Sequence, residues 1–164
     1  MSRIKFGPEC WAGGPQPINL PMAASQKFHE LGGALCHVDS NGRFALTLTA
    51  TASVLGWCNL GYSVGDSHVS GSVGSRVFTT SSTAGEKQLM TILAGGEMFW
   101  MPADDTFVEA THRGIDCDLI GVNDGTKQTA DIGTSSTNIL RIIDGTGTEV
   151  LVQVVAGILQ VAQV

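Results

Sequence analysis

The stretch of residues 97–155 constrains the fold of this chain more than any other part of the sequence. It consists of apolar runs of strand length, separated by short segments rich in Gly, Asn, Asp and Thr. Such segments are typical of tight turns, because Gly readily adopts a positive φ and Asn or Asp tolerates it. The runs cover residues 97–102, 116–122, 138–143 and 149–155, and the turns cover residues 123–125 and 144–147. Punctuated runs of this kind indicate antiparallel β structure.

The composition extends this interpretation to the whole chain. At 164 residues, the sequence predicts a single domain that is large enough to bury a core. It contains 21 Gly and few stretches rich in strong helix formers, so we expect an all-β fold. Only 15% of the residues are charged, whereas about a quarter is usual in a globular domain. The scarcity of charge predicts that another chain covers a large part of the surface.

Residues 1–24 are predicted to form an extended N-terminal arm. Four of the five prolines precede residue 22 and are interleaved with glycine. Because Pro lacks a backbone donor and has a fixed φ, we expect neither a helix nor a central strand here. The arm nevertheless carries large apolar side chains that are unusual in a freely solvated tail: Phe6, Trp11, Ile18, Leu20 and Met22. Two interpretations remain open, in which the arm lies on its own domain or on a neighbouring subunit.

Residues 25–164 are predicted to form the β domain, and its clearest hairpin pairs residues 34–39 with residues 43–49. The turn between them is Ser40-Asn41-Gly42, a sequence typical of a hairpin turn. The second strand of this hairpin alternates apolar and polar residues. Its apolar face is expected to consist of Phe44, Leu46 and Leu48.

The remaining expected elements flank this hairpin. A helical turn is expected over residues 25–31, before Gly32-Gly33, and a third strand over residues 54–58. Residues 61–85 are rich in Gly, Ser and Thr and are predicted to be a loop-like insertion with few strands. Residues 87–93 and 97–101 are expected to pair with each other as a hairpin.

The charge and the cysteine spacing limit the possible partners and the compartment. The formal net charge of −6, with Lys and Arg scattered singly, disfavours direct nucleic-acid binding. Neither end of the sequence has the pattern of a signal peptide or of a membrane span, so we expect a protein made in a cytosol without a membrane partner. The widely spaced cysteines are expected to be buried free thiols: Cys10, Cys36, Cys58 and Cys117.

Residues 65–68, Gly-Asp-Ser-His, are similar to the Gly-Asp-Ser block of one family of serine esterases. A nucleophilic serine needs a base held within hydrogen-bond reach, and that family places a late Asp-x-x-His near the C-terminus. The last histidine here is His112, and no Asp stands three residues before it. A turn is therefore the preferred interpretation, no catalytic residue is predicted, and an esterase that uses Ser67 remains a distant alternative.

Two further candidate sites, for a metal and for a stacking ligand, have incomplete patterns. Cys36-His37 with Cys58 or His68 lacks the paired spacing of zinc ligands, and adjacent residues on a strand point to opposite faces. The acidic residues that could hold a hard cation are Asp104, Asp105, Asp116 and Asp118. Trp11, Trp57 and Trp100 could stack on a sugar or a base, although core or interface positions are preferred for them. We therefore predict no metal and no cofactor.

Several short motifs resemble the small capsid decoration, or cement, proteins of tailed bacteriophages. Over residues 33–58 these are Cys36-His37-Val38-Asp39, Asn41-Gly42-Arg43, Phe44-Ala45-Leu46 and Val54-Leu55-Gly56-Trp57. In the second half they are the segments 99–103, 117–120 and 150–154. The resemblance covers roughly residues 33–155, and the insertion at 61–85 departs from the most compact members.

The resemblance implies a small antiparallel β-barrel or β-tulip-like domain, commonly a homotrimer, on the outer surface of the virion. Such a protein would bind the major capsid protein and stabilise the shell across capsomer joints, without catalysis. The five apolar side chains of the arm would then contact the capsid or a neighbouring subunit. The alternative is a phage fibre or tail β domain that binds a receptor or a glycan, for which Trp57 or Trp100 would be exposed.

Overall fold

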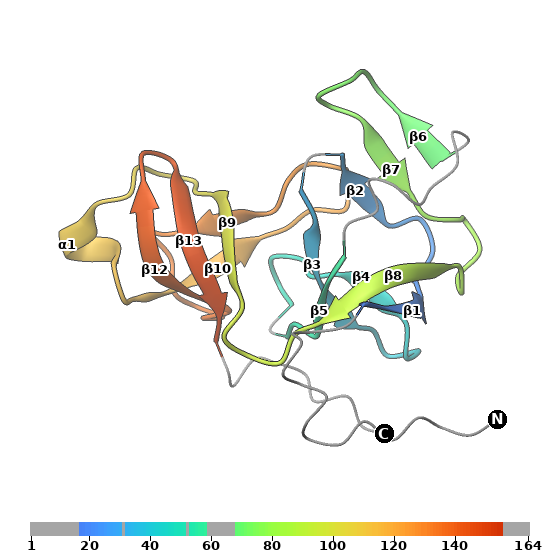
Figure 1. Cartoon of the computed structure of the whole chain (residues 1–164), viewed down its shortest axis with the longest axis horizontal. Helices are drawn as coiled ribbons and strands as arrows, with labels where there is room; N and C mark the ends of the chain where they lie inside the picture. The colour runs from blue at the N-terminus through green and yellow to red at the C-terminus, as the bar shows by residue number, and fades with distance from the viewer. Residues whose placement is uncertain (1–16, 31, 52, 59–67, 156–164) are drawn as a thin grey trace.

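The computed structural model describes residues 17–30, 32–51, 53–58 and 68–155. In this part of the chain the protein is almost entirely β structure, with one short helix, α1 (Glu109–His112). Two five-stranded antiparallel sheets lie side by side, and a smaller three-stranded sheet projects beyond the first of them (Figure 1). The expected all-β fold is therefore confirmed.

The first sheet has the strand order β1-β8-β5-β3-β4. Its strands are β1 (Pro17–Pro21), β3 (Ala34–Val38), β4 (Phe44–Leu46), β5 (Gly56–Cys58) and β8 (Lys87–Ile92). The sheet curls until its two edges approach each other, because Met22, directly after β1, forms a parallel bridge with Phe44 in β4. The N–H of Ala23 donates to the carbonyl oxygen of Phe44 at 2.7 Å. A cluster of buried side chains fills the curl, among them Met22, Phe28, Cys36, Phe44 and Met90.

The second sheet has the order β11-β10-β12-β13-β9 and comes from one continuous part of the chain. Its strands are β9 (Met98–Pro102), β10 (Asp116–Ile120), β11 (Thr129–Asp131), β12 (Leu140–Thr146) and β13 (Glu149–Val154). This sheet also curls, and its edges meet where Ala103 forms a parallel bridge with Ala130. The N–H of Asp104 donates to the carbonyl oxygen of Ala130 at 3.0 Å. Both sheets thus have the barrel-like curvature that the prediction of a β-barrel implied.

The strands predicted within residues 97–155 are all present, but one predicted turn is shorter than expected. The break expected at residues 144–147 lies mostly inside β12, which continues to Thr146. The pairing of β12 with β13 has an irregular register between Ile142 and Asp144, and this bulge absorbs the polar residues without ending the strand. The chain reverses only at Gly147, which has a φ of +58°.

The helical turn predicted over residues 25–31 is wrong. Residues 27–29 form β2 (Lys27–His29), which pairs with β7 (Val77–Thr79), and β7 in turn pairs with β6 (Val69–Ser70). Phe28 lies opposite Phe78 and is only 2% exposed, so burial of an aromatic pair outweighs the local helical propensity. The strands β6 and β7 also give structure to part of the predicted insertion at 61–85, of which residues 61–67 lie outside the described ranges.

The hairpin predicted between residues 87–93 and 97–101 is also wrong. β8 pairs with β1 and β5 in the first sheet, whereas β9 pairs with β13 in the second. The link between them crosses from one sheet to the other. Gly95 and Gly96 both have a positive φ, and the carboxylate of Glu97 accepts the N–H groups of Ala94 and Gly95 at 2.9 Å each. These bonds hold the link in a conformation that directs β9 away from β8.

The hairpin predicted over residues 34–49 is present as β3 and β4, with Gly42 in the turn at a φ of +72°. Phe44 and Leu46 are buried as expected. Leu48 lies beyond the end of β4 and is 37% exposed, so it does not belong to the predicted apolar face. The last hydrogen bond to β3 is donated by the N–H of Thr47 to the carbonyl oxygen of Leu35, and the chain leaves the sheet directly afterwards, so Leu48 is not held on the core face.

The two curled sheets are joined by packing and by hydrogen bonds. Leu35, Val54 and Leu93 lie in or directly beside strands of the first sheet but are buried in the hydrophobic cluster of the second sheet. In addition, Thr49 and Gly121 exchange bonds across the junction: the N–H of Thr49 donates to the carbonyl oxygen of Gly121, and the N–H of Gly121 donates to the hydroxyl of Thr49, both at 3.1 Å. The two sheets are therefore held together by a shared hydrophobic core and by specific hydrogen bonds.

We expect Gly121→Ala to destabilise the protein, because an added Cβ at residue 121 would overlap the carbonyl oxygen of Thr47. Backbone must move to relieve that overlap, and forced overpacking of this kind costs about 2 kcal/mol. Gly133→Ala is the matched control, since no atom lies within 4 Å of a Cβ placed there. Urea unfolding of both variants checks the prediction, which fails if the two have the same free energy of unfolding.

Candidate functional site

The structure places three of the five predicted contact residues in different environments, and Phe6 and Trp11 lie outside the described residues. Met22 is fully buried in the core of the first sheet and has no surface to offer a partner in this structure. Leu20 is partly buried against the same core. Ile18 is 44% exposed and is therefore accessible to another molecule. Residues 17–22 thus lie on their own domain, which was one of the two interpretations left open.

A surface at the edge of the first sheet, here called the β1 edge surface, consists of Ile18, Leu20 and Leu89. β1 is an edge strand that pairs only with β8, in a register that places Asn19 opposite Leu89. Leu89 is 46% exposed, and it projects on the other face of the β1–β8 ribbon from Ile18. No charged residue occurs from Cys10 to Gln26. The edge strand β1 itself is therefore uncharged, although proteins commonly protect a free edge with charge. The nearest charge in the pairing is Lys87 of β8, opposite Pro21.

Proline is compatible with β1 because the strand lies at an edge. Pro17 and Pro21 stand at its two ends, where the missing N–H groups interrupt no central ladder. The expectation that this segment forms no central strand agrees with its edge position. A further strand added to β1 would also find these two donors missing, which limits backbone pairing there. A partner at this edge would consequently be bound more by side-chain packing than by a new β ladder.

The histidine of the esterase-like string is used structurally. His68 Nδ1 lies 3.0 Å from the carbonyl oxygen of Thr79, so this nitrogen carries the proton and donates to β7. Ser67 lies outside the described residues, and His112 Nδ1 accepts the N–H of Val108 at 2.9 Å. In both His68 and His112, Nδ1 is therefore engaged in a hydrogen bond with a backbone group.

The candidate metal ligands are separated and have other roles. Within the described ranges, no group of three or more His, Cys, Asp or Glu side chains is arranged to hold a metal ion. Asp104 Oδ1 accepts the N–H of Ile132 at 2.9 Å, and Asp116 forms an ion pair with Arg141. Although Asp116 and Asp118 are both in β10, Asp118 binds the loop at residues 136–138 instead of sharing a ligand with Asp116.

Asp118 is a buried carboxylate that organises the loop before β12. It accepts the backbone N–H groups of Ser136, Thr137 and Asn138 at 2.7–2.9 Å, and it also accepts the Ser136 hydroxyl. Burial alone would raise the pKa of Asp118, but these donors stabilise the charged form and hold the pKa well below its usual range. The negative charge of Asp118 therefore serves to hold residues 136–138 against β10 of the second sheet.

Three of the four cysteines are buried free thiols, as predicted, and Cys10 lies outside the described residues. Burial raises the pKa of Cys58 and of Cys117 to about 12, and it raises the pKa of Cys36 well above the usual value. Because the thiolate is the reactive form, these side chains are poor nucleophiles at neutral pH. They contribute to packing.

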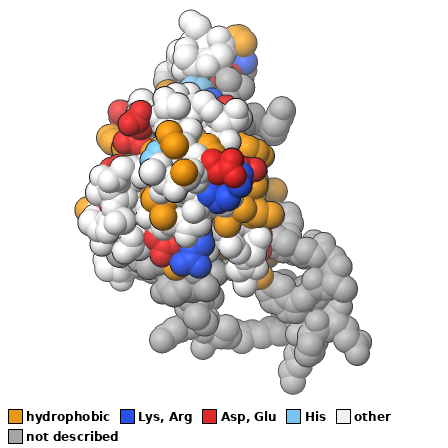
Figure 2. Space-filling view, turned by 90° about the vertical axis from the view of Figure 1, so that its left-hand side faces the viewer, with side chains coloured by type: hydrophobic (Ala, Val, Ile, Leu, Met, Phe, Trp, Pro, Cys, Tyr) orange, Lys and Arg blue, Asp and Glu red, His pale blue; other side chains and the backbone are white. Residues whose placement is uncertain are grey.

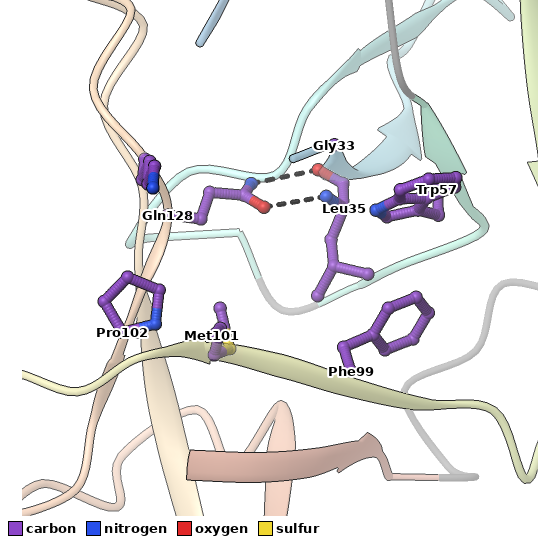
Figure 3. A pocket seen from close by; sticks show the side chains of 8 residues that line it. Gly33, Leu35, Trp57, Phe99, Met101, Pro102 and Gln128 are labelled. Atoms are coloured by element: carbon purple, nitrogen blue, oxygen red, sulfur yellow. Dashed lines mark hydrogen bonds between the residues drawn. The ribbon is translucent and has the colours of Figure 1, made fainter. Parts of the chain in front are cut away.

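A small pocket lies at the junction of the two sheets (Figure 3). Its volume is about 80 Å³, and its walls are mostly apolar. The Trp57 and Phe99 rings face each other across it with centroids 6.4 Å apart. On the opposite side, the Gln128 amide pairs with the backbone of Leu35: Oε1 accepts its N–H at 2.7 Å, and Nε2 donates to its carbonyl oxygen at 3.0 Å. Because Nε2 also donates to the carbonyl oxygen of Thr47 at 2.8 Å, the amide has no free donor for a ligand.

The second sheet carries the most exposed tryptophan of the described chain. Trp100, on β9, is 58% exposed, and Met98 on the same face of β9 is 55% exposed. Trp57, by contrast, is partly buried against the core of the second sheet. The end of the molecule that carries this sheet displays apolar side chains next to adjoining acidic and basic groups (Figure 2). Of the three tryptophans considered for a stacking ligand, Trp11 lies outside the described residues, and Trp100 is the more accessible of the other two.

Two features of these surfaces were not predicted. The sequence does not indicate on which face of its strand Leu89 lies. It also does not predict that Gln153, Arg141 and Asp116 continue a row from Met98 across the neighbouring strands. The signal for the row was present, because Arg141 and Gln153 interrupt otherwise apolar strands with the period of two that marks an outward face. The same alternation in β8 is misleading, since Gln88 is buried and Leu89 is exposed.

No helix in the described residues is long and apolar enough to cross a membrane. The comparisons with known proteins give no further assignment: no protein-family model, no curated protein and no solved structure matches this chain.

Proposed function

We propose that this chain is a structural protein that binds the outer surface of a tailed-phage capsid and stabilises it across capsomer joints. The motifs that resemble capsid decoration proteins support this proposal. The observation that carries it is the β1 edge surface, which leaves Ile18 exposed on an uncharged edge strand and Leu89 exposed on the neighbouring strand β8. An apolar edge of this kind is a liability in a free protein and an advantage in a protein that is seated on a partner.

The binding mechanism needs burial of surface and no reacting group. The apolar side chains at the β1 edge would pack into a groove between capsid subunits, and each subunit of a homotrimer would add the same contact. Once the first subunit of a trimer is bound, the others engage at a high effective concentration, so modest interfaces give tight overall binding. The apolar residues that precede β1 in the sequence would extend the contact from the same edge.

The direct test replaces the exposed edge residues without disturbing the core. Ile18→Asp with Leu89→Asp should reduce binding to undecorated capsids at least about tenfold, because each introduced carboxylate would lose solvation in an apolar contact. Val73→Asp with Val108→Asp, at two exposed positions outside the first sheet, is the control with the same change of charge. Co-sedimentation measures bound protein. Equal binding by the edge variant and the wild type would contradict this assignment.

Deletion of residues 1–24 is not a suitable test, because it would remove β1 and the buried Met22. A loss of binding would then be confused with a loss of folding. The point substitutions at Ile18 and Leu89 avoid this problem, since both side chains are largely outside the core. The thermal transition of each variant shows whether the fold is retained.

A further inference from the structure

The outer face of the second sheet combines an exposed aromatic ring with a row of polar side chains. Met98, Gln153, Arg141 and Asp116 lie opposite one another on β9, β13, β12 and β10, so they form one continuous row across four strands. Trp100 lies on the same face two residues along β9, opposite Leu151. We propose that this surface, here called the β9 face, binds a neutral saccharide, with a sugar ring stacked on Trp100.

The aromatic part of the β9 face is suited to stacking. One face of a pyranose ring presents mainly C–H groups, which pack on an indole ring, and the indole is amphipathic enough to remain exposed when no ligand is bound. Trp100 and Met98 are both more than half exposed, on the face of β9 opposite to Phe99 and Met101, which pack against the core. A ring could therefore approach Trp100 without displacing any of the described residues.

The polar part of the β9 face offers oriented hydrogen-bonding groups. Arg141 Nε lies 2.7 Å from Asp116 Oδ1, and Arg141 Nη2 lies 3.1 Å from Asp116 Oδ2. This two-point pair fixes the planes of both side chains while leaving further guanidinium N–H groups and carboxylate lone pairs unused. The Gln153 side-chain amide makes no hydrogen bond to the described residues and can both donate and accept. Planar groups of this kind match the adjacent hydroxyls of a sugar.

A groove on the side of this row away from Trp100 provides space for a second ring of a longer saccharide. It has a volume of about 260 Å³, which is enough for a sugar ring, and it is lined by the turn at residues 94–96 together with Arg141, Gln153, Val154 and Val155. Gly96 is close to the row, since a Cβ placed there would lie 3.9 Å from Gln153 Nε2. The groove thus continues the β9 face from the polar row toward the backbone of the turn.

The charges on the β9 face favour a neutral ligand. Arg141 and Asp116 neutralise each other, so the face offers no cluster of cations of the kind that phosphate groups need. The exposed carboxylate of Glu149, on the same face, further disfavours an anionic ligand. A protein interface core is usually depleted of charged residues, whereas here an ion pair makes up one end of the row. Saccharide binding is therefore preferred to docking of a second copy, which becomes an outcome of the test. The inference does not depend on capsid binding, because the β1 edge surface lies on the other sheet.

The test follows the indole N–H and side-chain amide signals of the full-length protein by NMR. The probes are glucose, galactose, mannose and N-acetylglucosamine, with maltose, cellobiose, lactose and chitobiose, each titrated to about 20 mM because a site with a Kd near 1 mM is worth only about 4 kcal/mol. We expect at least one of these sugars to shift the signals of Trp100 and Gln153, while the signal of Trp57 stays in place. Trp100→Ala should abolish the response, and Gln153→Ala should weaken it about tenfold.

Leu89→Ala is the control, since it removes a similarly exposed apolar side chain from the other sheet and should leave the response unchanged. The proposal is overturned if none of the eight sugars shifts the Trp100 signal. It is also overturned if the response survives Trp100→Ala, or if the Trp100 signal moves with protein concentration alone, which would identify the β9 face as an interface between copies. Capsid binding by the same sample reports separately on the proposed function, because it is measured without sugar.

Discussion

Gln128→Leu should lower the free energy of unfolding by about 3 kcal/mol, because it leaves two buried backbone groups without a partner. The N–H of Leu35 donates to Gln128 Oε1, and the carbonyl oxygen of Thr47 accepts from Gln128 Nε2. The carbonyl oxygen of Leu35 is less affected, since it also accepts the N–H of Thr47 at 3.0 Å. For a protein of this size, the expected loss corresponds to a fall of about 10 °C in Tm.

Two further variants show whether the hydrogen bonds are responsible. Gln153→Leu makes the same change of side chain at an amide without a bond to the described residues, and it should alter stability by less than about 0.5 kcal/mol. Gln128→Glu keeps the size of the side chain but places a carboxylate oxygen against two carbonyl oxygens. It should therefore be destabilising as well, and most strongly at neutral pH, where the carboxylate is charged. If Gln128→Leu and Gln153→Leu unfold at the same urea concentration, the account of the junction is wrong.

Asp118→Asn should cost about 2–3 kcal/mol at pH 7, since hydrogen bonds to a charged acceptor are stronger than those to an amide. The carboxylate accepts three backbone N–H groups and one hydroxyl, and an amide has only one oxygen to offer them. Because the amide nitrogen is itself a donor, it would also oppose the N–H groups it faces. Asp105→Asn, at an exposed carboxylate, is the matched control and should change stability little.

The cost of Asp118→Asn should depend on pH in a defined direction. The pKa of Asp118 is lower in the folded protein than in the unfolded chain, so the unfolded chain takes up a proton first as the pH falls. The charge contributes its full stability above the unfolded pKa, near pH 4, and the contribution decreases as the pH falls toward the folded pKa. Urea midpoints of the wild type and the variant should therefore converge below about pH 4. A difference that grows on acidification would contradict the assignment.

The sequence was sufficient to predict those strands and hairpins that are specified by residues close together in the chain. The hairpin of β3 and β4 follows from Asn41-Gly42 between two alternating strands, and β12 and β13 follow from apolar runs around Gly147. The pairings that failed are non-local. Nothing in residues 87–101 indicates that β8 pairs with β1 and β5, or that β9 pairs with β13, because strand partners depend on which edge is free after the sheets have curled.

The surfaces were predicted less completely than the fold, for a related reason. Ile18 was identified because it is an apolar residue in a Pro-rich segment, whereas Met22 in the same segment is in the core. Neither the alternation of apolar residues nor their hydropathy indicates that Met22 is buried and Ile18 exposed. Gln128 is a polar residue in a turn-rich stretch, and its role exists only because the folded chain brings it to the backbone of Leu35, 93 positions earlier. Such a role depends on tertiary contact and has no local pattern.

The central claim, that this chain binds a capsid surface, is tested most directly by sedimenting the purified wild-type protein with shells of the major capsid protein that lack it. The solution mass is measured on the same sample. We expect a trimer that sediments with the shells and saturates at a few hundred copies per shell, a number set by icosahedral symmetry. A protein that stays in the supernatant at about 10 μM, a concentration well above the Kd of a specific contact, would contradict the claim.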